Sequence, residues 1–88
     1  MNINANYLLD KEVERIEAED SLILLQENQG SAFVLDSIAK ELLEYFDGEH
    51  SVTQISNCLA QKYGDTYKEE EFFFFVKELI QKNILLEK

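Results

Sequence analysis

The sequence predicts an α+β, winged-helix-like fold in which a small antiparallel three-stranded sheet is followed by three helices. Segments of strand length occupy residues 11–35, and helix-start signals follow in the rest of the chain. No proline and only three glycines interrupt these segments. At 88 residues, of which 45% are hydrophobic, the chain is long enough for one domain with one core.

The first two strands are predicted from length and charge. Residues 11–18 are rich in charge and lack enough apolar partners for a helical stripe, so we interpret them as a short charged strand. Residues 21–26 follow a turn signal at Asp20 and have the length of a strand. Residues 1–6 are polar and are expected to form a flexible N-terminus, so that the domain covers residues 7–88.

The third strand is the segment on which the functional interpretation depends. Residues 27–30 predict a hairpin turn in which Gly30 takes a positive φ. The chain then returns through Ser31, Ala32, Phe33, Val34 and Leu35, with Phe33 and Leu35 on one face and Ala32 and Val34 on the other. This strand runs into a helix without an intervening loop. If it lies at a sheet edge, its backbone can pair with another chain.

The first helix is predicted to start at an N-cap formed by Asp36 or Ser37 and to run to about Phe46, where Asp47-Gly48 ends it. Its expected buried residues are Ile38, Leu42, Tyr45 and Phe46.

The second helix opens with a capping box from Ser51 to Gln54 and ends at Gly64. Its apolar stripe is Val52, Ile55, Leu59 and Tyr63.

A second capping box, from Thr66 to Glu69, is expected to open the third helix, and Asn83 is expected to close it. Its core stripe is Phe72, Phe75, Val76 and Leu79, after which residues 84–86 pack back as an apolar tail.

Four consecutive phenylalanines, residues 72–75, cannot all face one core, because a helix rotates about 100° per residue. Phe73 should border the core stripe together with Lys77 and Ile80, whereas Phe74 should be exposed. We therefore take Phe73 and Phe74 as candidate docking contacts, the alternatives being scattered surface hydrophobicity or dimerisation.

Composition disfavours several classes of function. The net charge of −10 repels a nucleic-acid backbone and an anionic membrane surface. No apolar run approaches the length of a membrane span, and the N-terminus does not resemble a secretory signal. A lone cysteine, Cys58, fits a reducing cytoplasm and is expected to be a buried, inert thiol.

Catalysis and cofactor binding find no support in the sequence. One His and one Cys cannot form a metal site unaided, and His50 is expected to be structural or solvent-facing. No serine has an implied histidine or lysine partner, and no glycine-rich phosphate loop exists. We therefore expect no enzyme activity, no metal and no cofactor.

The ordered set of motifs resembles the PqqD-like family, named for pyrroloquinoline quinone biosynthesis protein D, which includes peptide-recognition domains of ribosomally made, modified peptide pathways. The resemblance covers roughly residues 7–86 and rests on Gly30, the strand that ends Leu35-Asp36, the helix that ends Asp47-Gly48, the capped Ser51–Ile55 segment, Tyr63-Gly64, the Phe72–Leu79 stripe and Leu85-Leu86. Asn83 stands where the family commonly has a glycine, and Ala32 where it often has a tyrosine.

The resemblance implies a non-catalytic protein that holds the leader segment of a precursor peptide and presents it to a modifying enzyme or a leader protease. The leader would add as a strand beside residues 31–35 and lie against the third helix, a mode called β-augmentation. The expected contacts are Ser31, Ala32, Phe33, Val34, Leu35, Phe73, Phe74, Lys77 and Ile80. Lys40, Lys77 and Lys82 would either meet acidic leader side chains or remain solvated.

Two further interpretations stay open. A winged-helix DNA-binding regulator would share the sheet and the three helices, but its recognition helix should carry Lys or Arg, whereas the third helix here begins with Glu69, Glu70 and Glu71. A general protein–protein scaffold, including a homodimer through an unpaired strand edge, is the other alternative.

Overall fold

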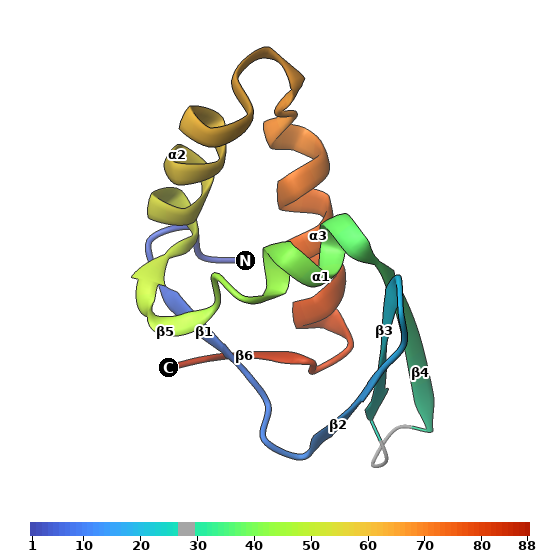
Figure 1. Ribbon diagram of the computed structural model, residues 1–88. Helices are drawn as coiled ribbons and strands as arrows, with labels where there is room; N and C mark the ends of the chain where they lie inside the picture. The colour runs from blue at the N-terminus through green and yellow to red at the C-terminus, as the bar shows by residue number, and fades with distance from the viewer. Residues whose placement is uncertain (27–29) are drawn as a thin grey trace.

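The computed structural model describes residues 1–26 and 30–88. Three α-helices and two three-stranded antiparallel sheets build the fold, which confirms the predicted α+β class (Figure 1). Sheet order is β2-β3-β4 in the first sheet and β5-β1-β6 in the second. Figure 1 shows the first sheet on one side of the molecule, with α1 leading away from it toward the second sheet.

The first sheet is the one that the sequence predicts. It contains β2 (Val13–Glu17), β3 (Ser21–Gln26) and β4 (Ser31–Asp36), and β3 pairs with both neighbours in regular antiparallel register. The turn predicted for residues 27–30 falls mostly outside the described residues, but Gly30 has the expected positive φ of 63°.

Side chains along β4 alternate between the inner and the outer face of the sheet, as predicted. Leu35 is buried and Phe33 half-buried on the inner face, whereas Ala32 and Val34 are exposed on the outer face. One face of the strand therefore packs on the core and the other meets solvent.

The second sheet was not predicted. It consists of β1 (Asn6–Leu9), β5 (Asp47–Ser51) and β6 (Leu85–Glu87), which come from three distant parts of the chain. Asn6, which we expected to belong to a flexible end, starts the central strand, and the backbone N–H of Thr53 donates to the Ile3 carbonyl at 2.9 Å. The N-terminus thus also contacts the first turn of a helix.

Strand β5 replaces the predicted helix end. Helix α1 (Ser37–Leu43) stops three residues earlier than expected, after which Glu44, Tyr45 and Phe46 form tighter hydrogen bonds to residues three positions back. Asp36 is the N-cap, as predicted, and its carboxylate accepts from Ala39 N–H at 2.8 Å.

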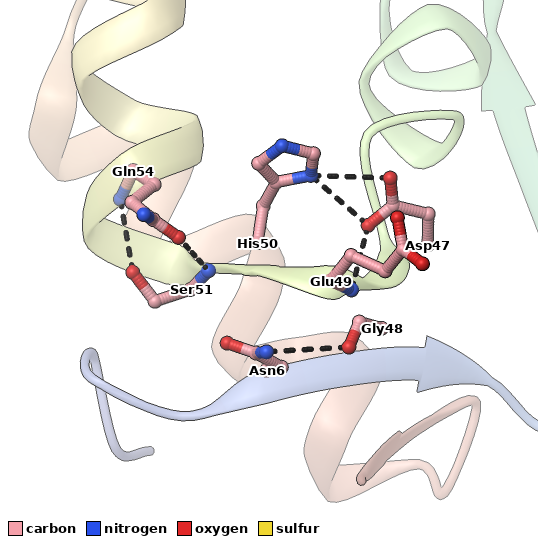
Figure 2. Close-up of polar contacts among 7 residues, drawn as sticks. All are labelled: Asn6, Asp47, Gly48, Glu49, His50, Ser51 and Gln54. Atoms are coloured by element: carbon pink, nitrogen blue, oxygen red, sulfur yellow. Dashed lines mark hydrogen bonds and ion pairs between the residues drawn. The ribbon is translucent and has the colours of Figure 1, made fainter.

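Pairing of β5 with β1 is irregular around Gly48, which has φ of 80° and lies against the Leu8 side chain. Figure 2 shows how polar contacts hold this segment: Asn6 Nδ2 donates to the Gly48 carbonyl at 3.2 Å, and Asp47 accepts from Glu49 N–H at 2.8 Å. His50 Nδ1 lies 3.1 Å from the same carboxylate. These contacts hold the pKa of Asp47 below its usual value, chiefly through the Glu49 N–H.

Helix α2 (Val52–Tyr63) has the predicted capping box. Ser51 Oγ accepts from Gln54 N–H at 3.1 Å, and Gln54 Oε1 accepts from Ser51 N–H at 2.8 Å (Figure 2). Its buried residues include Val52, Ile55 and Leu59.

Cys58 is exposed, so the prediction of a buried thiol was wrong. The core stripe of α2 includes Ile55 and Leu59, and Cys58 is rotated about 100° from Leu59 around the helix axis.

Helix α3 (Glu69–Gln81) does not use the capping box predicted at Thr66. Its N-cap is Lys68, which makes no side-chain capping bond, while Thr66 ends the short 3₁₀ turn η2 (Gly64–Thr66) and donates to the Tyr63 carbonyl at 2.7 Å. At the other end Asn83 takes a positive φ of 58° just after the last turn. Ile84 and Leu85 are buried, and Leu85 begins β6.

Candidate functional site

The candidate site is built around β4, which is an edge strand. It pairs with β3 only, among the strands that the structure describes. Its residues from Ser31 to Leu35 carry no charge and no proline. Natural edge strands usually carry a charged residue or a proline, which prevents pairing with other chains. Because this edge has neither, it is chemically open to an added strand.

The hydrogen-bond pattern shows which backbone groups point outward from β4. Ala18 N–H donates to the Ser21 carbonyl at 2.9 Å, so Ser21 directs its backbone groups toward β2. Because this direction alternates along a strand, Leu22 and Leu24 direct theirs toward β4, where they pair with Leu35 and Phe33. The N–H and C=O groups of the alternate β4 residues, which include Ala32 and Val34, therefore point away from β3.

Helix α3 and β4 run in opposite directions, as one contact and one shared pocket indicate. Near the start of β4, Lys82 Nζ lies 5.4 Å from the centroid of the Phe33 ring. Near its end, Asp36 lines one pocket together with Glu71 and Phe75 of α3. The flank of α3 that faces β4 is therefore the one that carries Phe75 and Lys82.

An apolar pocket of about 420 Å³ lies where β4 passes into α1. Its walls come from the end of β4, from α1, from the last part of α2, from η2 and from the first half of α3. The lining residues are Asp36, Ile38, Ala39, Leu42, Leu59, Tyr63, Thr66, Tyr67, Lys68, Glu71, Phe72 and Phe75. A pocket of this size and character suits an apolar side chain of a ligand.

Ile38 differs most from the core that was predicted from the sequence. It was expected to be buried, but its side chain is 64% exposed and lies on the pocket wall. The prediction was wrong because α1 is only seven residues long, and among the residues of this helix only Leu43 is fully buried. The result is an apolar side chain held at the surface beside the open strand edge.

Tyr67, one of the two tyrosines that line the pocket, has a raised pKa. Partial burial raises the pKa of Tyr67, against the opposing effect of its hydrogen bond with Ser56, whose Oγ lies 2.6 Å from the phenolic oxygen. This bond ties the segment before α3 to α2. A partly buried hydrogen bond thus fixes Tyr67 in the pocket wall.

The structure does not bring together all the residues predicted for the site. Phe73 and Phe74 lie about 160° and 100° around α3 from Phe75, and Lys77 and Ile80 lie about 160° and 140° from it. Phe73 is half-buried against the Phe72 ring, with centroids 5.9 Å apart, and Phe74 is 64% exposed, as expected. None of these four side chains lines the pocket.

Sequence reasoning therefore missed the pocket-facing flank of α3. Phe72 and Phe75 were assigned to the core, and Phe72 is indeed 3% exposed, whereas Phe75 is only half-buried. A signal existed in the sequence, because Glu71, Phe75 and Lys82 recur at helical spacing on one side of the core stripe.

Neither a metal site nor a membrane-spanning helix is seen in the described part of the chain. Within it, no three His, Cys, Asp or Glu side chains are grouped closely enough to hold a metal ion. None of the helices described there is both long and apolar enough to cross a membrane.

Comparison with solved structures finds the same fold in proteins of low sequence identity. TbiB1, solved in complex with the TbiA(beta) leader peptide, is 18% identical with a TM-score of 0.70, and the match covers 89% of this chain and 93% of that one. A heterocyclase solved with substrate and cofactor is 16% identical with a TM-score of 0.66, and the heterocyclase TruD is 21% identical with a TM-score of 0.64. Those two matches cover 96% of this chain but only 11% and 12% of the heterocyclase chains.

Sequence comparison gives the family. A search of curated proteins finds no significant match. The family model described as coenzyme PQQ synthesis protein D matches residues 21–85, which include β3 and β4 of the first sheet, all three helices, β5 and the start of β6. The chain therefore belongs to the PqqD family.

Proposed function

We propose that this chain is a non-catalytic peptide-recognition protein. It captures the leader segment of a ribosomally made precursor peptide by β-augmentation at β4 and presents the peptide to a modifying enzyme or a leader protease. The observation that carries this proposal is the edge strand itself: Ala32 and Val34 direct backbone donors and acceptors outward, beside an apolar pocket.

Family membership supports a role in peptide recognition, and the fold shared with TbiB1, which was solved with a leader peptide, supports the same role. The fold shared with part of two heterocyclases supports an enzyme as the second partner. The acidic first turn of α3, Glu69 to Glu71, weighs against the alternative of DNA binding, because phosphates would be repelled there.

Affinity in this mode has two sources. Backbone hydrogen bonds to Ala32 and Val34 bind any extended segment, whereas the pocket beside Ile38 and Phe75 selects among side chains. Ser31, Phe33 and Leu35 contribute through their place in the strand, since their backbone groups hold β4 on β3. We propose that α3 contacts the peptide through the flank that carries Phe75. Variants on the other flank then serve as controls, at Phe73, Phe74, Lys77 and Ile80.

A proline scan of the two sheet edges tests the proposal. Val34→Pro removes an outward N–H that β3 does not use, so the sheet should form while peptide binding falls at least tenfold. Glu17→Pro is the matched control, because Glu17 lies on the opposite edge strand, where its N–H also points away from β3. Binding is measured by fluorescence anisotropy with peptides selected from a random 12-residue display library, and folding by circular dichroism.

Amide mapping on the wild-type chain gives a second readout that does not depend on a proline variant folding. Addition of a selected peptide should shift the Ala32 and Val34 amides most strongly and slow their hydrogen exchange. Equal binding by Val34→Pro and wild type, or amide shifts centred on β5 and β6, would show that β4 is not the docking edge.

A further inference from the structure

The surface that runs along β4 from Phe33 and Lys82 to the pocket, which we call the groove, has two chemically different ends. At the start of β4 an ammonium group, Lys82 Nζ, lies 5.4 Å from the centre of the Phe33 ring. At the end of β4 the apolar pocket opens, with the carboxylates of Asp36 and Glu71 in its lining. A segment bound along this groove would therefore meet a cation at one end and an apolar cavity with acidic groups at the other.

Lys82 is the cation of this groove best placed for a ligand. Its side chain is exposed at the end of α3, and within the described part of the chain no carboxylate lies within 4.0 Å of it. By contrast, Lys40 lies 3.9 Å from Glu17, and Lys62 forms an ion pair with Glu41. Contact with the Phe33 ring holds the Lys82 ammonium above the strand rather than away from it.

Acidic groups set the preference at the pocket end. The Asp36 carboxylate is fixed there because it caps α1 through Ala39 N–H. Glu71 comes from the facing helix, and Lys68 is the single cation in the lining. An acidic ligand side chain is disfavoured at this end, whereas Ile38, Tyr63 and Phe75 provide apolar contact.

Strand geometry fixes the distance between the two ends. Side chains of an added strand point toward the helix at every second residue. The position opposite Phe33 is the one nearest Lys82, and four residues along an added strand would reach the end of β4, where Asp36 and Ile38 line the pocket. At about 3.3 Å per residue these two positions are about 13 Å apart.

Direction follows from the sheet. All pairings within the first sheet are antiparallel, and antiparallel pairing is the more stable per residue. A segment that runs antiparallel to β4 passes the pocket before it passes Lys82. The order of its side chains is then apolar first and acidic second.

Building on the peptide-recognition function proposed above, we propose that the groove selects a segment in which a bulky apolar residue is followed four residues later by Asp or Glu. The apolar side chain enters the pocket between α1 and α3, and the carboxylate pairs with Lys82. This assigns both the chemistry of the recognised peptide and its direction along β4.

A charge-reversal selection tests this. Random 12-residue peptides displayed on phage are selected in parallel on the wild-type chain, on Lys82→Glu and on Lys77→Glu. Wild type should enrich the apolar residue followed by the acidic residue at a spacing of four. Lys82→Glu should keep the apolar residue and replace the acidic residue by Lys or Arg.

Lys77→Glu is the matched control. It makes the same substitution on the same helix, at an exposed position on the flank that faces away from the pocket, and it should enrich the same sequences as wild type. Thermal denaturation of the three proteins checks that they are equally folded.

Synthetic peptides then measure the coupling. Changing the acidic residue to Lys should weaken binding to wild type by about threefold to fivefold, the range of an exposed ion pair. The same change should strengthen binding to Lys82→Glu by a similar factor. A peptide with the two residues in reverse order should bind wild type more weakly than the original.

Several outcomes would overturn the inference: no charge preference at this spacing, a preference that changes with Lys77 instead of Lys82, or better binding of the reversed peptide. Failure of the underlying peptide-recognition function looks different. In that case no enriched peptide would lose affinity for the Val34→Pro variant, whatever its charge pattern.

Discussion

Four identical side chains in sequence meet four environments in α3. Phe72 is 3% exposed in the core, Phe73 packs half-buried on its ring, Phe74 is 64% exposed, and Phe75 faces the pocket. Helix rotation alone separates the buried phenylalanine from the exposed one, which is why both were predicted correctly. It does not decide which flank of the helix meets β4, because that depends on how the helix is placed on the sheet.

At this scale we predict that Phe75→Ala weakens peptide binding about tenfold while the fold is retained, because the side chain lines the pocket and is only half-buried. A tenfold loss corresponds to about 1.4 kcal/mol. Anisotropy titration measures the binding, and urea denaturation measures the free energy of unfolding.

Phe73→Ala is the control for this prediction, since it removes a phenylalanine from the opposite flank of α3. It should lower the free energy of unfolding but leave the affinity for the peptide nearly unchanged. Phe72→Ala should cost about 3–5 kcal/mol of stability, as expected for a buried aromatic residue. If Phe73→Ala lost more affinity than Phe75→Ala in folded protein, the peptide would lie on the flank first predicted from the sequence.

Some helix starts are determined by residues close in the sequence, and others are not. The capping box at Ser51 was predicted and is formed, because both of its bonds lie within four residues. The similar pattern at Thr66 is not used: Tyr67 and Lys68 are extended, and α3 begins only at Glu69. A capping box forms only where the residues that follow the cap position are helical, and Tyr67 and Lys68 are not.

For the elements we predict that Ser51→Ala lowers the free energy of unfolding by about 1 kcal/mol, the usual cost of losing an N-cap. Thr66→Ala should cost less than half as much, because its hydroxyl bonds only the Tyr63 carbonyl at an exposed turn. Urea denaturation of both variants makes the comparison. An equal or larger cost at Thr66 would mean that its hydroxyl stabilises the start of α3 after all.

The whole molecule combines an uncharged strand edge with a net charge of −10. Edge strands of this kind pair readily with copies of themselves, whereas like net charge on two copies opposes their approach. We therefore expect the net charge to oppose self-pairing through β4, and salt to weaken this opposition by screening.

Accordingly, we predict a monomer at an ionic strength of about 0.01 M and a homodimer paired through β4 at about 1 M, where the Debye length falls to about 3 Å. Sedimentation velocity on the full chain gives the oligomeric state. Val34→Pro should remain monomeric at both ionic strengths, and Glu17→Pro should behave as wild type. A dimer that persists in Val34→Pro would use another surface.

The first sheet and the helices were predictable because their signals are short-range: the turn signal and length of β3, alternation along β4, the caps at Asp36 and Ser51, and the terminator Gly64. The second sheet was not, because its strands are polar or short and gain their bonds only from each other. Asn6 pairs with Ser51, and Leu9 pairs with Leu85. No local pattern records a pairing over such separations.

The sequence by itself determined the PqqD-like resemblance, the strand from Ser31 to Leu35 and the alternation of its side chains. These depend on residues close together in the chain, whereas the edge position of this strand came from the structure. Only the tertiary structure decided that the Phe75–Lys82 flank of α3, and not the Phe73–Ile80 flank, faces that strand, and that Ile38 lines a pocket instead of the core. The physical reason is that a helix rotation specifies which residues share a face, whereas packing against distant elements specifies where that face points.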